Sequence, residues 1–313
     1  METNRPGLST ILLTAVAPMA WGSTYIVTEK FLPPDRPLFA ALVRALPIGL
    51  ALLAWRRQLP HGEWWWKSVL LGICNIGAFF PLVFLSAYYL PGGLAATVQA
   101  LLPLAVMAIA WPLIRERPGV LRVLAAVVGL AGVGLLVMRS PDGVTALGLA
   151  GAIGSVLVSA LGNVLIKRWP APVDLLTLMS WQLVAGGVLL LPLAFLVEGA
   201  PPAIDLSAAA GYAWLGIIST GLAYYCWFRG LTLMPAGGTA LIGLINPLVG
   251  TVLGVAFAAE AFGLTQVFGM LLVLGGVLAG QPAVAALLRR RVRLPDPEEE
   301  PREAAVAALV TRP

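Results

Sequence analysis

Ten long apolar runs separated by short junctions constrain the fold of this chain more than any other feature of its sequence. A helix needs about 20 mostly apolar residues to cross roughly 30 Å of hydrocarbon, and these runs reach that length. Charged residues form only 11% of the chain, well below their share in soluble domains. The sequence therefore predicts an all-α membrane protein. Its ten spans are expected at residues 8–28, 37–55, 67–89, 92–114, 119–138, 145–167, 173–197, 208–231, 235–257 and 263–287.

Lysine and arginine residues gather on one side of these spans. An even number of spans puts both termini on the same side, and that side holds 16 of the 20 Lys and Arg residues against three on the other. Because positive residues favour cytoplasmic loops, we expect a protein of the plasma (bacterial inner) membrane with both termini in the cytoplasm. The net charge of +5 lies largely in these loops and the C-terminal tail. The expected partners are therefore the lipid bilayer and a small-molecule substrate, and no nucleic acid.

Two parts of the chain repeat each other at a shift of 144 residues, without a gap from residue 71 to residue 133. Leucine and valine recur by chance in any membrane protein, whereas proline, glycine and glutamate at one fixed shift do not. The shift carries the third to fifth predicted spans onto the eighth to tenth. The identical pairs include Leu71-Gly72-Ile73 and Leu215-Gly216-Ile217, Phe84 and Phe228, Pro91 and Pro235, Pro103 and Pro247, Glu116 and Glu260, and Gly132 and Gly276.

Each half of the chain therefore holds five spans. Because five is odd, the second half enters the membrane from the opposite side, and such an inverted repeat is the common architecture of secondary transporters. The two halves can exchange conformations, so that one site near the midplane opens alternately to each side. We expect residues 1–142 and 143–288 to form the two five-helix repeats around a central cavity. Residues 289–313 are expected to form a disordered cytoplasmic tail.

Three motifs resemble those of a known family. They are "WGSTY" at residues 21–25, Arg44 in the second span, and the doubled Pro…Glu…Gly pattern of "LLPLAVMAIAWPLIRERPG" and "INPLVGTVLGVAFAAEAFG". In these motifs the chain is similar to the drug/metabolite transporter superfamily, specifically its ten-helix EamA type, and most like its exporters of aromatic amino acids. The resemblance implies a basket of helices with spans 1, 3, 4, 6, 8 and 9 nearest the cavity. The second half departs from the first in lacking a counterpart of Trp21-Gly22-Ser23.

Polar and aromatic residues within the spans are the candidates for solute contact, because such groups avoid lipid and face the interior of a bundle. Each also has a structural alternative, since a hydrogen bond to another helix satisfies an amide as well as a solute does. The stripe of Gly151, Ser155 and Ser159 is interpreted as helix packing. The substrate-binding candidates are Trp21, Ser23, Thr24, Tyr25, Asn75, Phe79, Gln99, Asn163, Tyr224 and Asn246.

Arg44 is the one clear charge within a span. It could bind a carboxylate or phosphate of a substrate, or it could snorkel outward or donate to backbone carbonyls, and we favour the structural role. A second open choice concerns Phe80, Phe84 and Tyr88, which share a helix face that contacts either lipid or protein.

Four residues at helix ends are given structural roles. Glu116 and Glu260 are expected to cap helices or to pair with nearby arginines such as Arg115 and Arg122. Pro91 and Pro235 are expected at the start of helices, where a missing N–H does no harm.

Acidic residues and histidine are absent from the middle of every predicted span. A carboxylate-based proton relay is therefore not expected, and no metal, cofactor or catalytic residue is predicted. A neutral, aromatic cavity suits a small zwitterionic or uncharged solute with an apolar side chain. We predict a secondary transporter that exports small metabolites, above all amino acids with aromatic or large apolar side chains, by alternating access.

Other functions are weaker alternatives. An exporter of drugs or other neutral metabolites would use a similar cavity. A membrane enzyme that modifies lipids would need clustered Asp, Glu or His near the interface, and His61 stands alone in its loop. An inverted repeat argues against a receptor, and no ring of like residues indicates a channel filter. The sequence fixes no oligomeric state, and a monomer would suffice.

Overall fold

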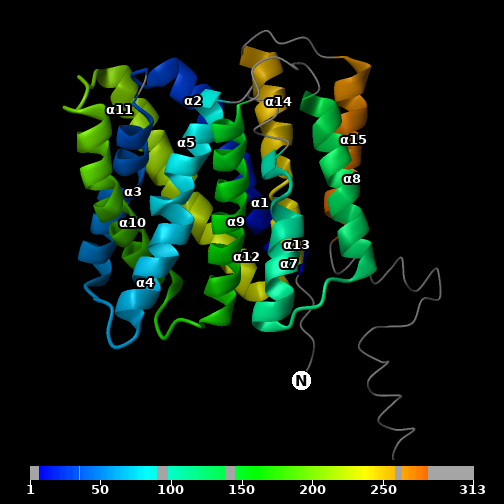
Figure 1. The fold of residues 1–313 in the computed structure, drawn as a ribbon, viewed down its shortest axis with the longest axis horizontal. Coiled ribbons are helices and arrows are strands. Elements are labelled where there is room, and N and C mark those ends of the chain that lie inside the picture. Colours follow the sequence, from blue (N-terminus) through cyan, green and yellow to red (C-terminus); the bar gives the residue numbers. More distant parts are fainter. Residues whose placement is uncertain (1–6, 35, 90–97, 138–144, 258–262, 281–313) are drawn as a thin grey trace, which may run out of the picture.

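A computed structural model describes residues 7–34, 36–89, 98–137, 145–257 and 263–280 of the chain. All regular secondary structure in these ranges is helical, and the helices run alongside one another in a single bundle (Figure 1). The chain enters at one end of the bundle, and the connection between the first two spans lies at the opposite end. The predicted all-α fold is thereby confirmed.

The first half builds five spans. Two of them are composite, because the first is interrupted at Ser23 and the third contains a π-helical segment. The first span consists of α1 (Leu8–Gly22) and α2 (Thr24–Phe31), the second of α3 (Pro37–Arg56), the third of α4 (Trp64–Gly72), η1 (Ile73–Gly77) and α5 (Phe79–Tyr89), the fourth of α7 (Leu102–Ile114), and the fifth of α8 (Val120–Val137).

The second half repeats this plan. Its eighth span again contains a π-helical segment, and its ninth is interrupted at Gly243. The sixth span is α9 (Ala146–Arg168), the seventh α10 (Leu175–Glu198), the eighth α11 (Leu206–Ala213), η2 (Trp214–Leu222) and α12 (Ala223–Leu233), the ninth α13 (Ala236–Ile242) and α14 (Ile245–Phe257), and the tenth α15 (Leu264–Ala279).

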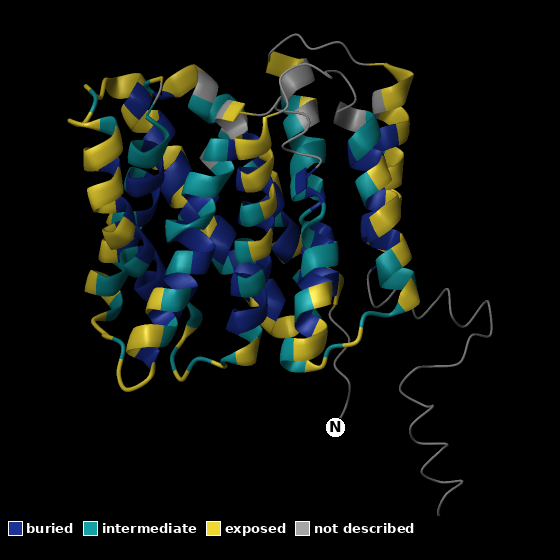
Figure 2. Cartoon of the chain, in the orientation of Figure 1, coloured by how far each residue is buried: buried dark blue, intermediate teal, exposed yellow. Residues whose placement is uncertain are grey.

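Within the described residues, six of these spans are long and apolar enough to cross a membrane, and the other four are shorter apolar segments. Their outer faces carry large exposed apolar side chains, for example Leu196 and Leu206, whereas buried residues concentrate in the interior (Figure 2). In water such a surface would be unfavourable, but in a bilayer lipid chains cover it. The bundle therefore has the surface of a membrane protein.

Close packing between spans uses glycine where backbones meet. A Cβ atom added to Gly72 of α4 would lie 2.8 Å from the carbonyl oxygen of Gln182 in α10, so only glycine fits there. The neighbouring helix α10 also packs along α3, and α8 packs along α15. Small residues at such contacts let helices approach in the absence of a hydrophobic driving force between them.

The two π-helical segments are related by the internal repeat. Adding 144 to the bounds of η1, Ile73–Gly77, gives residues 217–221, which lie inside η2 at Trp214–Leu222. A π-helix is rare, and it changes the ladder of backbone hydrogen bonds where it occurs. The repeat thus extends from residue identities to backbone geometry.

Candidate functional site

A cavity of about 690 Å³ lies in the centre of the bundle. Its lining begins at the connection between α2 and α3, at the end of the bundle away from the N-terminus, and ends deep in the interior. Spans 1, 3, 4, 6, 8 and 9 contribute to it, as the family resemblance implies, and span 2 contributes as well. The side chains discussed below that line it are Trp21, Thr24, Thr28, Arg36, Arg44, Asn75, Phe79, Phe80, Gln99, Ser159, Asn163, Tyr224, Trp227, Phe228 and Asn246.

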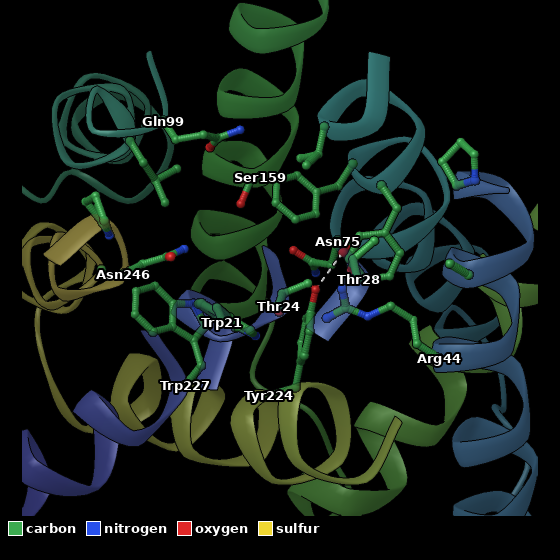
Figure 3. A pocket seen from close by; sticks show the side chains of 18 of the residues that line it. Trp21, Thr24, Thr28, Arg44, Asn75, Gln99, Ser159, Tyr224, Trp227 and Asn246 are labelled. Atoms are coloured by element: carbon green, nitrogen blue, oxygen red, sulfur yellow. Dashed lines mark hydrogen bonds between the residues drawn. The ribbon is translucent and has the colours of Figure 1, made fainter. Parts of the chain in front are cut away.

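Aromatic rings form the inner end of the cavity. The ring centroid of Trp21 lies 5.6 Å from that of Tyr224 and 5.2 Å from that of Trp227. The ring of Phe228 lies 5.4 Å from that of Tyr224 and meets it edge to face. We call Trp21, Tyr224, Trp227 and Phe228 the aromatic floor; three of them are labelled in Figure 3. Such a floor offers a flat apolar contact to a solute ring.

Hydrogen bonds fix the polar edges of the aromatic floor. The indole N–H of Trp21 donates to the Ser219 carbonyl at 2.9 Å, and that of Trp227 donates to Asn163 Oδ1 at 3.1 Å. The Tyr224 hydroxyl donates to the Asn75 carbonyl at 3.0 Å. Ser219 and Asn75 belong to the two π-helical segments. Both segments therefore use a backbone carbonyl to hold an aromatic side chain in place.

The amide of Asn75 is paired with a residue that the sequence candidates did not include. Asn75 Nδ2 donates to Gln182 Oε1 at 2.8 Å, and both side chains are buried. Gln182 lies on α10, which contributes no described residue to the cavity wall. Its position in the middle of an apolar span was a signal, because an amide there requires a partner.

Arg44 lies in the cavity wall and is only 6% exposed. Its Nε donates to Thr220 Oγ1 at 3.0 Å and its Nη2 to the Ser219 carbonyl at 3.2 Å. The guanidinium carbon lies 4.4 Å from the ring centroid of Phe80. Snorkelling to the surface, one alternative considered for Arg44, is therefore wrong, because α3 packs against α10 and η2 and points this residue inward.

The structure gathers most of the sequence candidates around this cavity. Trp21, Thr24, Asn75, Phe79, Gln99, Asn163, Tyr224 and Asn246 all line it. Ser23 does not; its hydroxyl donates to the Ala20 carbonyl and accepts from Trp214 Nε1. Gln99 also donates to Ser155 Oγ at 2.6 Å. The side chain of Tyr25 lies outside the described residues.

Several lining residues were left out of the candidate set, among them Trp227, Thr28, Ser159 and Phe80. Helical spacing groups Trp227 with Tyr224 and Thr28 with Thr24, and both residues lie in the cavity wall. Ser159 was interpreted as helix packing, yet it lines the cavity. Phe80 is buried beneath Arg44, so its face contacts protein and not lipid. The side chains of Phe84 and Tyr88 lie outside the described residues.

Charged side chains close the bundle at the end that carries the N-terminus. Glu116, directly after α7, accepts from Lys167 Nζ at 2.8 Å and from the backbone N–H of Ala236 at 3.2 Å. Lys167 also donates to the Met234 carbonyl at 3.0 Å. Glu116 thus connects the first half of the chain to α9 and to the start of α13 in the second half. Arg122, one of the two arginines expected to pair with Glu116, forms a longer ion pair with it, at 4.0 Å between Nη1 and Oε1.

The other helix-end residues have the following outcomes. Pro235 stands immediately before α13, as predicted. Pro91 and Glu260 lie outside the described residues. Within the described ranges, no three His, Cys, Asp or Glu side chains come together as a metal site.

A ten-helix bundle with a central cavity of aromatic and neutral polar residues is the arrangement of a membrane transporter, with its solute site between two halves. A model of the EamA-like transporter family matches residues 8–138 and again residues 146–279. The chain belongs to this family and carries its domain twice. It is a transporter and not an enzyme, which agrees with the prediction from the sequence.

Relatives match over nearly their full length. Protein PecM of Dickeya dadantii (strain 3937) is 37% identical over 279 residues, which cover 88% of this chain and 94% of PecM. The uncharacterized inner membrane transporter YicL of Salmonella typhimurium is 26% identical over 311 residues, which cover 94% of this chain and 99% of YicL. A crystal structure described only as that of a protein superposes with a TM-score of 0.75 at 22% identity, covering 91% of this chain and 99% of that one. At this identity the likeness supports the fold alone.

Proposed function

We propose that this transporter exports amino acids with aromatic or other large apolar side chains by alternating access across the bacterial inner membrane, with both termini in the cytoplasm. The observation that carries the proposal is the aromatic floor at the inner end of a 690 Å³ cavity. That volume lies in the range of small-molecule sites. Trp21, Tyr224 and Trp227 suit a flat apolar side chain, and the neighbouring amides and hydroxyls suit its polar end.

The remaining parts of the proposal rest on topology and comparison. The relative YicL is named as an inner membrane transporter, and the bias of positive residues supports cytoplasmic termini. The cavity lining reaches the opposite end of the bundle, and the Glu116 contacts close the end with the N-terminus. With the termini in the cytoplasm, these features support an outward-facing state, from which a solute is released.

Counterflow in proteoliposomes tests the proposal. Vesicles loaded with unlabelled L-phenylalanine should accumulate labelled L-phenylalanine from outside, with saturation, and the same assay extends to the other amino acids. Protein-free vesicles are the control. Saturable exchange of uncharged aromatic compounds without exchange of any amino acid would replace the proposal with the export of drugs or neutral metabolites. Flux that does not saturate would indicate a channel.

A further inference from the structure

We propose that Arg44 binds the carboxylate of the transported solute, so that the substrates are aromatic or large apolar carboxylates and not uncharged compounds. This inference rests on the proposed function and assigns the polar end of the solute. It gives Arg44 a binding role in addition to its contacts within the protein. Four features of the site support it.

The first is that Arg44 has only neutral partners. Thr220 Oγ1 and the Ser219 carbonyl accept from Nε and Nη2, and the face of Phe80 lies below the guanidinium. Of the Asp and Glu residues in the described ranges, none forms an ion pair with Arg44. A buried cation without an anionic partner is unfavourable, so a site of this kind favours an anion.

The second is that part of the guanidinium has no protein acceptor. Among the described residues, no hydrogen bond from Nη1 is found, whereas Nε and Nη2 are both engaged. The engaged donors hold the planar group in one orientation. The Nη1 donors then remain for a solute, and a guanidinium fits a carboxylate better than any other side chain does.

The third is the charge of the cavity as a whole. Two charged side chains line it in the described part of the chain, and both are arginines, Arg36 near the opening and Arg44 inside. Tyr224 does not balance them, because its hydroxyl donates to the Asn75 carbonyl and is therefore protonated. Both charges in the described lining are therefore positive, which favours an anionic group near Arg44.

The fourth is the position of Arg44 relative to the aromatic floor. Figure 3 shows the Arg44 side chain directed toward Tyr224 and Asn75, with Trp21 and Trp227 beyond them. Arg44 and Trp21 share one acceptor, the Ser219 carbonyl, so the cationic group and the aromatic floor are held by the same backbone atom. A solute with its carboxylate at Arg44 can therefore lay an aromatic side chain on the floor.

Ligand binding to the purified full-length chain tests the inference without any variant. The probes are 3-phenylpropionate and 3-phenylpropan-1-ol, which share a carbon skeleton and differ in the carboxylate. Isothermal titration should give a dissociation constant for the carboxylate that is about 10- to 100-fold lower, as expected for hydrogen bonds to a charged group. Equal affinity for the two probes, or no binding of the carboxylate at millimolar concentration, would overturn the inference.

Variants then assign the effect to this residue. Arg44→Gln should remove the preference for the carboxylate and leave the affinity for the alcohol unchanged, while Arg44→Lys should keep part of the preference. The control is Arg57→Gln, an exposed arginine just beyond the other end of α3, which should bind both probes like the wild type. A carboxylate preference that persists in Arg44→Gln would refute the assignment. Should Arg44→Gln not fold, the comparison between Arg44→Lys and wild type decides.

L-Phenylalanine as a third probe separates this inference from the proposed function. If 3-phenylpropionate binds through Arg44 and L-phenylalanine does not compete, amino-acid export is wrong and the carboxylate site stands. If L-phenylalanine is exchanged in counterflow as well by Arg44→Gln as by wild type, export of amino acids stands and the Arg44 site is wrong.

Discussion

The hydroxyl of Tyr224 donates to the backbone carbonyl of Asn75 at 3.0 Å, although the two residues are 149 positions apart in the chain. Tyr224 follows the π-helical segment of the second half, and Asn75 lies within that of the first. The bond therefore joins the two halves at equivalent irregular segments beside the cavity. Since a carrier must move its halves relative to each other, contacts of this kind are where solute binding can affect conformation.

Trp21→Ala should abolish most of the transport. The substitution removes the ring that contacts both Tyr224 and Trp227, and loss of aromatic contacts to a solute predicts a fall in affinity of at least about tenfold. Trp21→Phe keeps a ring and loses the hydrogen bond to the Ser219 carbonyl, at a cost of about 0.5–1.5 kcal/mol in unfolding free energy. Counterflow and thermal unfolding measure the two effects. Transport by Trp21→Ala at the wild-type rate would contradict the role of the aromatic floor.

Gly162→Ala should destabilise the bundle and impair transport. A Cβ at residue 162 would meet Asn75 Oδ1 and lie 3.1 Å from Cys74 Cβ, so it would displace the Asn75 amide from Gln182. Overpacking of this kind costs about 1–3 kcal/mol. The matched control is Gly134→Ala in α8, where a Cβ meets no heavy atom within 4 Å. Equal unfolding temperatures for the two variants would show that the contact at residue 162 relaxes freely.

Thr24→Val should weaken solute binding without loss of stability. The Thr24 hydroxyl lines the cavity, is buried, and has no hydrogen-bond partner among the described residues. Replacing such a hydroxyl by a methyl group removes an unsatisfied group, but it also removes one hydrogen bond to the solute, worth about three- to tenfold in affinity. Titration with L-phenylalanine measures this loss.

Thr14→Val is the control for that experiment. Thr14 is buried in α1, within the same first span, and donates to the Thr10 carbonyl at 2.7 Å, away from the cavity. Its replacement should lower the unfolding temperature and leave the affinity for L-phenylalanine unchanged. The opposite pattern, with Thr24→Val unstable and fully able to bind, would show that the Thr24 hydroxyl has a structural role only.

Glu116→Gln should make the cavity more accessible from the side that carries the N-terminus. Glutamine keeps the shape of Glu116 but loses the ion pair with Lys167 that closes this end. An impermeant thiol reagent added on that side should label a cysteine in the cavity faster than it does in the wild type. Glu63→Gln is the control, because Glu63 forms an exposed ion pair with Lys67 within one helical turn. Equal rates in the two variants would exclude Glu116 from closing the bundle.

The sequence predicted the fold well because length and composition alone specify membrane spans. It predicted the repeat because identical prolines and glycines recur at one shift, and the structure adds that the repeat includes a π-helical segment. Element interruptions such as those at Ser23 and Gly243 were not predicted, since they depend on how neighbouring helices pack.

The candidate site was predicted in part, and the misses have a common cause. Trp21 and Ser23 are two residues apart, so they point to different sides of a helix with 3.6 residues per turn; sequence could not decide which of them meets the cavity. The inward position of Arg44 depends on α3 lying between α10 and η2. The Asn75–Gln182 pair joins residues that no local pattern connects. The rotation of a helix about its axis and the helices that it contacts depend on tertiary packing, so no local sequence pattern specifies them.

Side-specific labelling of one cysteine tests most directly the central claim, that a single cavity between two halves opens alternately to each side. Ser159→Cys, in a Cys74→Ala/Cys226→Ala background, places the thiol in the cavity wall. In oriented proteoliposomes without solute, an impermeant thiol reagent should label it from the side opposite the termini. Addition of L-phenylalanine should raise labelling from the side of the termini. Labelling from neither side, or from one side only while counterflow proceeds, would contradict the account.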